Sequence, residues 1–199
     1  MRRISAVVLA AGESRRMGAI NKLLMPVRGV PILRRVLEVL TAVKLQEIVV
    51  VLGHEREQVL PLLDGLDVRT VVNERFREGQ MSSVWAGMSA LSVPCDGVMI
   101  CLGDQPLLTP GDIAALSEAF GQIGDRSILV PAYHGQRGNP LILSYKHRES
   151  ILAGERNLGC KRLIERNPEL VATFETNSDH FVLDIDTPEA YESLLARVD

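Results

Sequence analysis

The sequence lacks the features that mark several special classes of protein. Its cysteines number only three, Cys95, Cys101 and Cys160, and they have no CxxC spacing. This argues against a disulfide framework or a zinc site. No apolar run reaches membrane-spanning length, and the N-terminal residues lack the long apolar core of a signal peptide. We therefore expect a cytoplasmic protein with no membrane partner.

A strong charge of either sign is also missing. The 22 basic and 25 acidic residues give a formal net charge of -3, which argues against nucleic acid as the main partner. Hydrophobic residues make up 46% of the 199 residues, enough for an ordered core. We find no linker, repeat or low-complexity segment, so residues 1–199 are expected to form one domain.

Buried-strand patterns alternate with helical patterns along the first part of the chain. Apolar runs predict strands over residues 4–9, 47–52, 68–72 and 97–102. Helices are predicted after Pro31, where Leu33, Val36, Leu37 and Leu40 share a face, over residues 81–91, and after Thr109-Pro110. Apolar strands separated by helices are typical of a mostly parallel sheet covered on both faces.

The second part of the chain is less regular. Short strands are predicted over residues 128–131, 140–143, 171–174 and 181–183, and a last helix near Thr187-Pro188. The prediction is therefore a single α/β domain, three-layered and Rossmann-like, with a mostly parallel mixed sheet. In such sheets a ligand lies beyond the carboxyl ends of the strands, where residues 10–22, 103–106 and 184–188 are expected to converge.

Residues 7–22, VVLAAGESRRMGAINK, form the most informative segment. An apolar strand runs into a small turn, Ala10-Ala11-Gly12, and the cations Arg15, Arg16 and Lys22 follow. Outward-facing backbone amides ringed by cations bind phosphate. The segment lacks both the GxGxxG and the GxxxxGK[ST] spacing, which favours a wider loop around a triphosphate. The alternative is an ordinary strand-to-helix turn with solvated basic residues.

Two acidic clusters follow predicted strands. Asp104 comes directly after an apolar run, and Asp184 and Asp186 alternate, so both point to one side if the strand continues that far. Carboxylates in such places suit Mg²⁺, which takes one or two of them together with phosphate oxygens. The alternative roles are capping ones, with Asp104 at a turn and Asp186 or Thr187 before Pro188.

The stretch from Asn73 to Trp85 joins a predicted strand to a predicted helix. Gly79 permits a close backbone approach, and Gln80, Ser82 and Ser83 can either hydrogen-bond a nucleobase or cap the helix. Trp85 is expected in the core. His54 and His134 have no ligand-like neighbours, so we expect both in turns at the surface.

Together these motifs resemble a known family. LAAGESRRMG, residues 9–18, resembles the LAAGxSxRMG signature of the MobA-like nucleotidyltransferases, and GDQP (103–106), RGNP (137–140) and DIDTPEAY (184–191) match later family motifs in order. LAAG and EGQMSSV (78–84) are similar to the members that act as molybdenum cofactor cytidylyltransferases. The resemblance implies a fold of the nucleotide-diphospho-sugar transferase type.

The resemblance also implies roles for individual residues. Arg16, Lys22 and Asp104 would be catalytic, with Arg16 and Lys22 on the triphosphate, and Asp104 and Asp186 would coordinate Mg²⁺. Nucleotide binding is implied for a set drawn from the first loop and the later EGQMSSV segment: Leu9, Ala10, Ala11, Gly12, Ser14, Arg16, Lys22, Gly79, Gln80 and Ser83. Arg15 is expected to be solvated.

The activity implied is a Mg²⁺-dependent transfer of CMP from CTP to a phosphorylated acceptor, a molybdopterin-type cofactor, with release of pyrophosphate. A molybdoenzyme would then receive the cofactor. Two alternatives stay open: a nucleotide-sugar or CDP-alcohol pyrophosphorylase, and a non-catalytic nucleotide- or cofactor-binding delivery protein. Two departures from the family pattern concern the acceptor: Asn139 stands where histidine is frequent, and residues 159–164 replace a GARxLL-like segment.

Overall fold

A computed structural model describes residues 2–18, 20–153 and 160–198 of the chain. Its main sheet has eight strands, with β8 paired to β7 and the others in the order β10-β7-β9-β6-β1-β4-β5. Their bounds are Ile4–Ala10 (β1), Ile48–Leu52 (β4), Arg69–Val72 (β5), Gly97–Leu102 (β6), Ile128–Tyr133 (β7), Gln136–Arg137 (β8), Leu141–Ser144 (β9) and Val171–Glu175 (β10). A separate hairpin joins β2 (Pro26–Val27) and β3 (Val30–Pro31).

The sheet is mixed but mostly parallel, which confirms the predicted fold class. β1 lies between β4 and β6 and runs parallel to both, and the pairs β4–β5 and β7–β10 are also parallel. β9 runs antiparallel to β6 and β7. Because the central strands are buried on both faces, their side chains are almost all apolar, as in the sequence ISAVVLA of β1.

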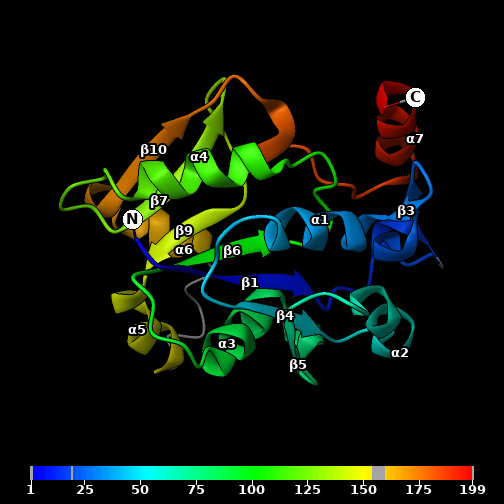
Figure 1. Cartoon of the computed structure of the whole chain (residues 1–199), viewed down its shortest axis with the longest axis horizontal. Coiled ribbons are helices and arrows are strands. Elements are labelled where there is room, and N and C mark those ends of the chain that lie inside the picture. The colour runs from blue at the N-terminus through cyan, green and yellow to red at the C-terminus, as the bar shows by residue number, and fades with distance from the viewer. Residues whose placement is uncertain (1, 19, 154–159, 199) are drawn as a thin grey trace.

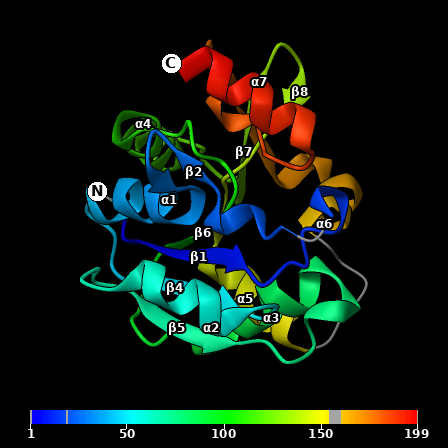
Figure 2. The ribbon, with the colours of Figure 1, turned by 90° about the vertical axis from the view of Figure 1, so that its right-hand side faces the viewer.

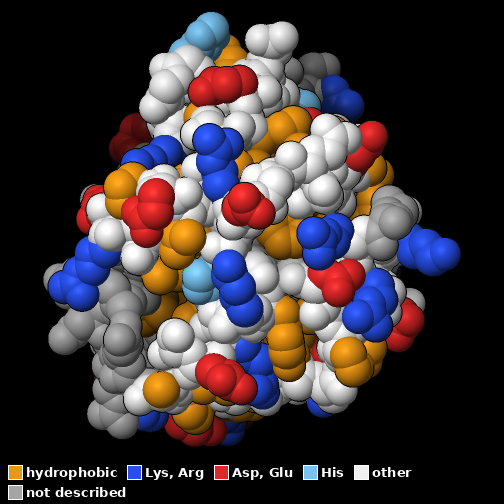
Figure 3. All heavy atoms as spheres, turned by 90° about the vertical axis from the view of Figure 1, so that its left-hand side faces the viewer, with side chains coloured by type: hydrophobic (Ala, Val, Ile, Leu, Met, Phe, Trp, Pro, Cys, Tyr) orange, Lys and Arg blue, Asp and Glu red, His pale blue; other side chains and the backbone are white. Residues whose placement is uncertain are grey.

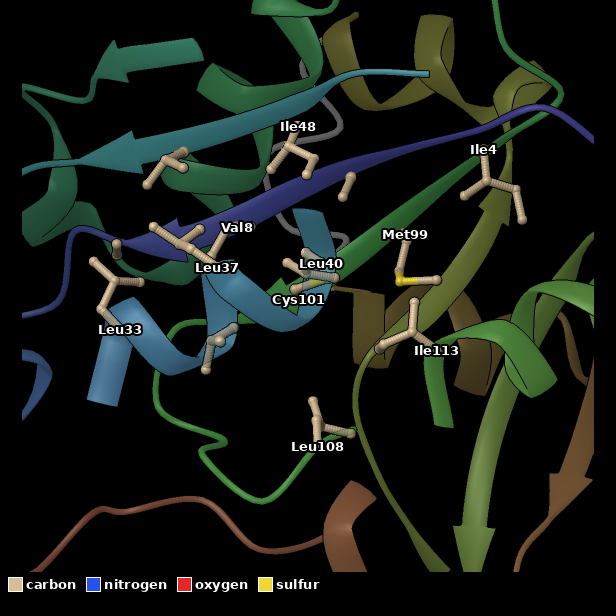
Figure 4. Packing of buried hydrophobic residues seen from close by; sticks show 14 of the residues in the cluster. Ile4, Val8, Leu33, Leu37, Leu40, Ile48, Met99, Cys101, Leu108 and Ile113 are labelled. Carbon is tan, nitrogen blue, oxygen red and sulfur yellow. The ribbon is translucent and has the colours of Figure 1, made fainter. Parts of the chain in front are cut away.

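Helices cover both faces of this sheet (Figure 1). α1 (Ile32–Thr41), α2 (Arg56–Val59) and α4 (Pro110–Phe120) pack on the face that carries Val8, and α3 (Gln80–Ala90), α5 (Arg148–Leu152) and α6 (Cys160–Arg166) on the face that carries Val7. Figure 4 shows Leu33, Leu37 and Leu40 of α1 directed toward the sheet. The alternation of buried side chains along β1 therefore produces the predicted three layers.

A smaller cluster attaches the last helix, α7 (Pro188–Val198), to the β2–β3 hairpin. Val27, Ile32, Ile185 and Leu194 are buried together, and Figure 2 shows α7 lying above the hairpin. Because Ile185 belongs to this cluster, the packing also holds the acidic segment next to it in place.

Short 3-10 helices fill several connections: Arg15–Met17, Lys22–Leu24, Leu60–Leu63, Phe76–Glu78, Tyr145–His147, Pro168–Leu170 and Asp179–Phe181. The last of these corrects one prediction, since residues 181–183 form no strand. The carbonyl oxygen of Phe181 accepts hydrogen bonds from the Gln105 side chain and the Asn139 amide instead of joining a strand ladder. Residues 181–183 therefore form a turn, and the apolar Phe181 is buried in the core.

A second correction concerns Trp85. The residue is 45% exposed on α3, and its indole N–H donates to the carbonyl oxygen of Leu152 at 3.3 Å. The indole ring therefore lies on the solvent-exposed side of α3, and its neighbours Ala86 and Gly87 are the residues buried against the core. By contrast Cys101 is buried in the core.

The surface shows no dominant charge on the face in Figure 3, where basic and acidic side chains are interspersed and hydrophobic groups are small and separate. Among the described residues no helix is both long enough and apolar enough to cross a membrane.

Candidate active site

A cavity of about 590 Å³ opens beyond the carboxyl ends of β1 and β6; Figure 2 views the molecule from that side. Residues from the first loop, the Asp104 turn and the Asp184–Asp186 segment all line it, so the predicted convergence is present. The lining includes every residue predicted for the site: Leu9, Ala10, Ala11, Gly12, Ser14, Arg16, Lys22, Gly79, Gln80, Ser83, Asp104 and Asp186.

The first loop is shaped by close backbone contacts. Gly53 lies so near the loop that a Cβ there would come within 2.7 Å of the Ala11 Cβ, and the amide of His54 donates to the Ala11 carbonyl oxygen. Ser14 takes a left-handed conformation, with φ of 50°, and its hydroxyl accepts from the Lys22 amide at 3.3 Å. The loop therefore folds back on itself and places Lys22 in the cavity.

Lys22 lies between two carboxylates. Its ammonium donates to Asp104 Oδ2 and, at 2.7 Å, to Asp186 Oδ1. Burial alone would lower the pKa of Lys22, but the two carboxylates outweigh it and raise the pKa above its ordinary value. Lys22 is therefore a permanent cation in this site.

The two arginines of the loop differ in their partners. Arg16 reaches the acidic segment, where its guanidinium donates to Asp186 Oδ2 at 2.5 Å. Arg15 instead turns to Glu13 at 2.6 Å and its side chain is 75% exposed, although it also lines the cavity. Burial raises the pKa of Asp186, but Lys22 and Arg16 together bring it below its ordinary value, so this carboxylate is ionised.

Asp104, Asp184 and Asp186 form a group that can hold a metal ion. Each offers one carboxylate oxygen, and the three oxygens lie within 4.8 Å of one another. Asp104 is nearly fully buried, and burial raises the pKa of its carboxyl despite Lys22 beside it. Within the described part of the chain, its buried Oδ1 has no hydrogen-bond partner. An all-oxygen carboxylate set with one vacant acceptor fits a hard divalent cation.

The acidic segment is held next to Asp104 by a few hydrogen bonds to backbone atoms, here called the backbone clamp, and not by a strand. Phe181 is fixed by the Gln105 side chain at 2.9 Å and by the Asn139 amide at 2.7 Å, and the Ile185 amide donates to the Asp104 carbonyl oxygen at 3.1 Å. Gly138 permits this approach, because a Cβ there would lie 2.3 Å from the Phe181 oxygen. Strand alternation predicted that Asp184 and Asp186 point to one side if the strand continued that far. The strand does not form, but this turn still brings both residues to the cavity.

Another part of the cavity wall is formed by the start of α3. Gly79, with φ of 103°, precedes the helix, and Gln80 and Ser83 line the wall. Two neighbours that sequence reasoning did not single out also contribute: Phe76, and Arg77 stacked 5.5 Å from its ring centroid.

Glu13 is another residue that sequence reasoning missed. It lines the cavity and pairs with Arg15 and, at 3.6 Å, with Arg77. An acidic residue inside a basic loop is the one signal in the sequence that points to it.

The two departures from the family pattern have different outcomes. Asn139 lines the cavity, and its amide donates to the carbonyl oxygen of Phe181, which shortly precedes the acidic segment. In the segment 159–164, residue 159 and the side chains of residues 160–162 lie outside the described residues, whereas Ile164 is buried in the core.

Comparison with known proteins agrees with the class of fold described above. Residues 6–173 match the family model of the MobA-like NTP transferase domain, and the chain belongs to that family. A solved structure of a homologue of Rv0371c from Mycobacterium sp. strain JC1 is 31% identical, with a TM-score of 0.82 over 100% of this chain and 98% of that one.

Rv0371c of Mycobacterium tuberculosis, solved in complex with manganese, is 25% identical, with a TM-score of 0.77 over 98% of both chains. Curated relatives include the bifunctional protein GlmU of Allorhizobium ampelinum, 33% identical over 66% of this chain. The chain spans 29% of the length of that protein. The nicotine blue oxidoreductase of Paenarthrobacter nicotinovorans is 26% identical over 96% of both proteins.

Proposed function

We propose that the chain is a nucleotidyltransferase that moves CMP from CTP to a phosphorylated acceptor of the molybdopterin type and releases pyrophosphate. One observation supports this most: a three-carboxylate group and the cations Lys22 and Arg16 line the same cavity as the backbone loop after β1. Residues 1–199 would form one such domain. A molybdoenzyme would then receive the product.

The residues of the site suit this chemistry. Asp104, Asp184 and Asp186 would hold Mg²⁺, which when bound neutralises phosphate charge. Arg16 and Lys22 would offset the charge that builds on the leaving pyrophosphate. The acceptor phosphate is already ionised near neutral pH, so the site has to position it rather than deprotonate it. The manganese complex of Rv0371c supports the use of a divalent cation.

The identity of the acceptor is the most specific part of the proposal. Asn139 lines the cavity and its amide binds Phe181, which shortly precedes the acidic segment, so the acceptor would enter from this side. A nucleotide-sugar or CDP-alcohol pyrophosphorylase would need the same nucleotide machinery with a different acceptor pocket. A delivery protein would bind nucleotide without turnover, and one full-length relative bears the name of an oxidoreductase. Transfer therefore has to be measured directly.

The test is a matrix of CTP, GTP, ATP and UTP against molybdopterin, a sugar phosphate and a polyol phosphate, read as pyrophosphate release with Mg²⁺. Release with CTP and molybdopterin is the expected result. Release with another acceptor would assign the chain to the pyrophosphorylases. Binding of CTP without release under every condition would contradict the enzymatic proposal and support the delivery protein.

A further inference from the structure

A buried amide lies behind the wall of the cavity formed by α3. Asn73 directly follows β5 and is 5% exposed. Its backbone amide donates to the Leu52 carbonyl oxygen at 2.8 Å, and its Oδ1 accepts from the Arg75 amide at 2.9 Å. Because a backbone amide can only donate, the side-chain atom facing Arg75 has to be the oxygen. The orientation of the Asn73 side chain is therefore fixed.

The NH₂ group of Asn73 consequently points toward α3. It donates one hydrogen bond to Ser82 Oγ at 2.8 Å and another to Ser83 Oγ at 2.9 Å. An amide nitrogen has two hydrogens, so both are used. Asn73 therefore determines that each serine oxygen acts as an acceptor toward it.

The two serines differ in which hydrogen-bonding positions of their hydroxyl groups are still unused. Ser82 lies within donor distance of the carbonyl oxygens of Arg75 and Gly79, and it lines a separate cavity that also contains Trp85. Ser83 lines the candidate active site and is 5% exposed. Among the hydrogen bonds of the described residues, the Ser83 hydroxyl makes only the one that it accepts from Asn73.

A hydroxyl has one hydrogen to donate. Since the Asn73 amide occupies an acceptor position of Ser83, the O–H hydrogen is left for a molecule in the cavity. Ser83 stands one helical turn after Gly79 on α3, which covers one face of the sheet, whereas the acidic segment packs beside α1 on the other face. With triphosphate at Lys22, a nucleobase would lie beside Ser83.

We propose that Asn73 is a positioning residue that fixes Ser83 as a hydrogen-bond donor and thereby makes the site favour a base that presents an acceptor. Counted along the Watson–Crick edge from the sugar side, cytosine presents acceptors at O2 and N3 and then the N4 amino donor. Guanine presents donors at N2 and N1 in the first two positions, and its acceptor O6 takes the place of the cytosine amino group. The inference rests on the proposed function only in taking a nucleoside triphosphate as the ligand. It deepens that function, because the donor role of Ser83 gives a physical reason for a preference for CTP over GTP.

The test is calorimetric binding of CTP and GTP, each with Mg²⁺, to the full chain and to Asn73→Asp. Aspartate keeps the acceptor for the Arg75 amide but has no hydrogens to donate. The Ser83 hydroxyl then donates to residue 73 and presents a lone pair to the cavity. The ratio of CTP to GTP affinity is expected to fall about tenfold or more, mainly through weaker CTP binding.

Two further variants complete the design. Ser83→Ala removes the donor itself, so it should weaken CTP more than GTP, and it tests the inference even if Asn73→Asp does not fold. Ser82→Ala removes the other partner of Asn73, which faces the separate cavity, and should leave the ratio of affinities unchanged. Thermal unfolding checks that each variant is folded.

Three results would overturn the inference: an unchanged ratio of affinities in folded Asn73→Asp, whether or not both affinities fall, an unchanged ratio in Ser83→Ala, or no binding of either nucleotide by the unaltered chain. An equal loss would reduce Asn73 to a structural support. Pyrophosphate release is measured separately. A shifted ratio without release would leave the inference standing without the enzyme, and release with an unshifted ratio would leave the enzyme without the inference.

Discussion

Lys22 and Asp186, which lie 164 positions apart in the chain, are joined by a hydrogen bond of 2.7 Å between Nζ and Oδ1. The same ammonium also binds Asp104. One partly buried cation therefore connects the loop after β1 to both predicted metal ligands. The first and last parts of the sequence therefore meet at one point of the cavity.

Replacing Lys22 by alanine is expected to weaken triphosphate binding. The change removes a permanent cation from the cavity, so the KM for the triphosphate should rise about tenfold or more, equivalent to about 1.4 kcal/mol. Steady-state pyrophosphate release measures it. Lys44→Ala, at an exposed site, is the matched control, and unchanged kinetics in Lys22→Ala would remove Lys22 from the site.

Gly138→Ala is expected to disturb the metal ligands without touching them. A Cβ at this position would lie 2.3 Å from the Phe181 carbonyl oxygen, so the segment carrying Asp184 and Asp186 has to move. A shift of about 1 Å is enough to lose much of a site's function, and Mn²⁺ affinity measured by calorimetry should fall about tenfold. Wild-type affinity in this variant would show that the clamp does not set the site.

Gly87→Ala tests the packing of α3 against the sheet. The added Cβ would come within 2.2 Å of Val7 Cγ1, and such overpacking costs about 1–3 kcal/mol. Urea unfolding measures the loss. Gly111→Ala in α4 is the control, because its Cβ meets only Thr109 Oγ1 at 3.6 Å. Equal stabilities of the two variants would contradict the close contact of α3 with β1.

Glu47→Gln is expected to lower stability in a pH-dependent way. The Glu47 side chain is 6% exposed and accepts from Arg69 and from the amides of Ser92 and Val93. Burial alone would raise its pKa, but these hydrogen bonds bring the pKa below the ordinary value of 4.5. Near neutral pH the variant should lose about 1.5–3 kcal/mol of unfolding free energy.

The sign of the pH effect follows from that lowered pKa. The stabilisation by Glu47 is complete above 4.5 and is lost as the pH falls through the lower folded value. Urea unfolding across this range should therefore show the gap between wild type and Glu47→Gln closing toward low pH. Glu74→Gln, an exposed partner of Arg56, should change little at any pH, and a pH-independent gap for Glu47→Gln would refute this account.

Much of the fold and the lining of the cavity could be predicted from the sequence. Apolar runs and helical periodicity depend on local burial, so β1, β4, β6 and α1 were predictable from their own residues. The LAAG loop and Asp104 follow strands directly, and the carboxyl ends of parallel strands meet at one edge.

The remaining features depend on contacts between distant residues. Residues 181–183 have a strand-like composition, but the Gln105 and Asn139 contacts to Phe181 decide their conformation. The position of Trp85 depends on α5, which lies beside α3. Arg77 and Glu13 join the cavity through a pairing across 64 residues, and no local pattern encodes such a pairing.

The central claim is that the three-carboxylate cavity transfers a nucleotidyl group. Pyrophosphate release from CTP with Mg²⁺ and molybdopterin, compared between Asp104→Asn and wild type, tests it most directly. Asp104→Asn is expected to lose activity on the order of a hundredfold or more while remaining folded, and Asp125→Asn, at an exposed aspartate, should retain full activity. Near-normal release by Asp104→Asn would contradict the claim.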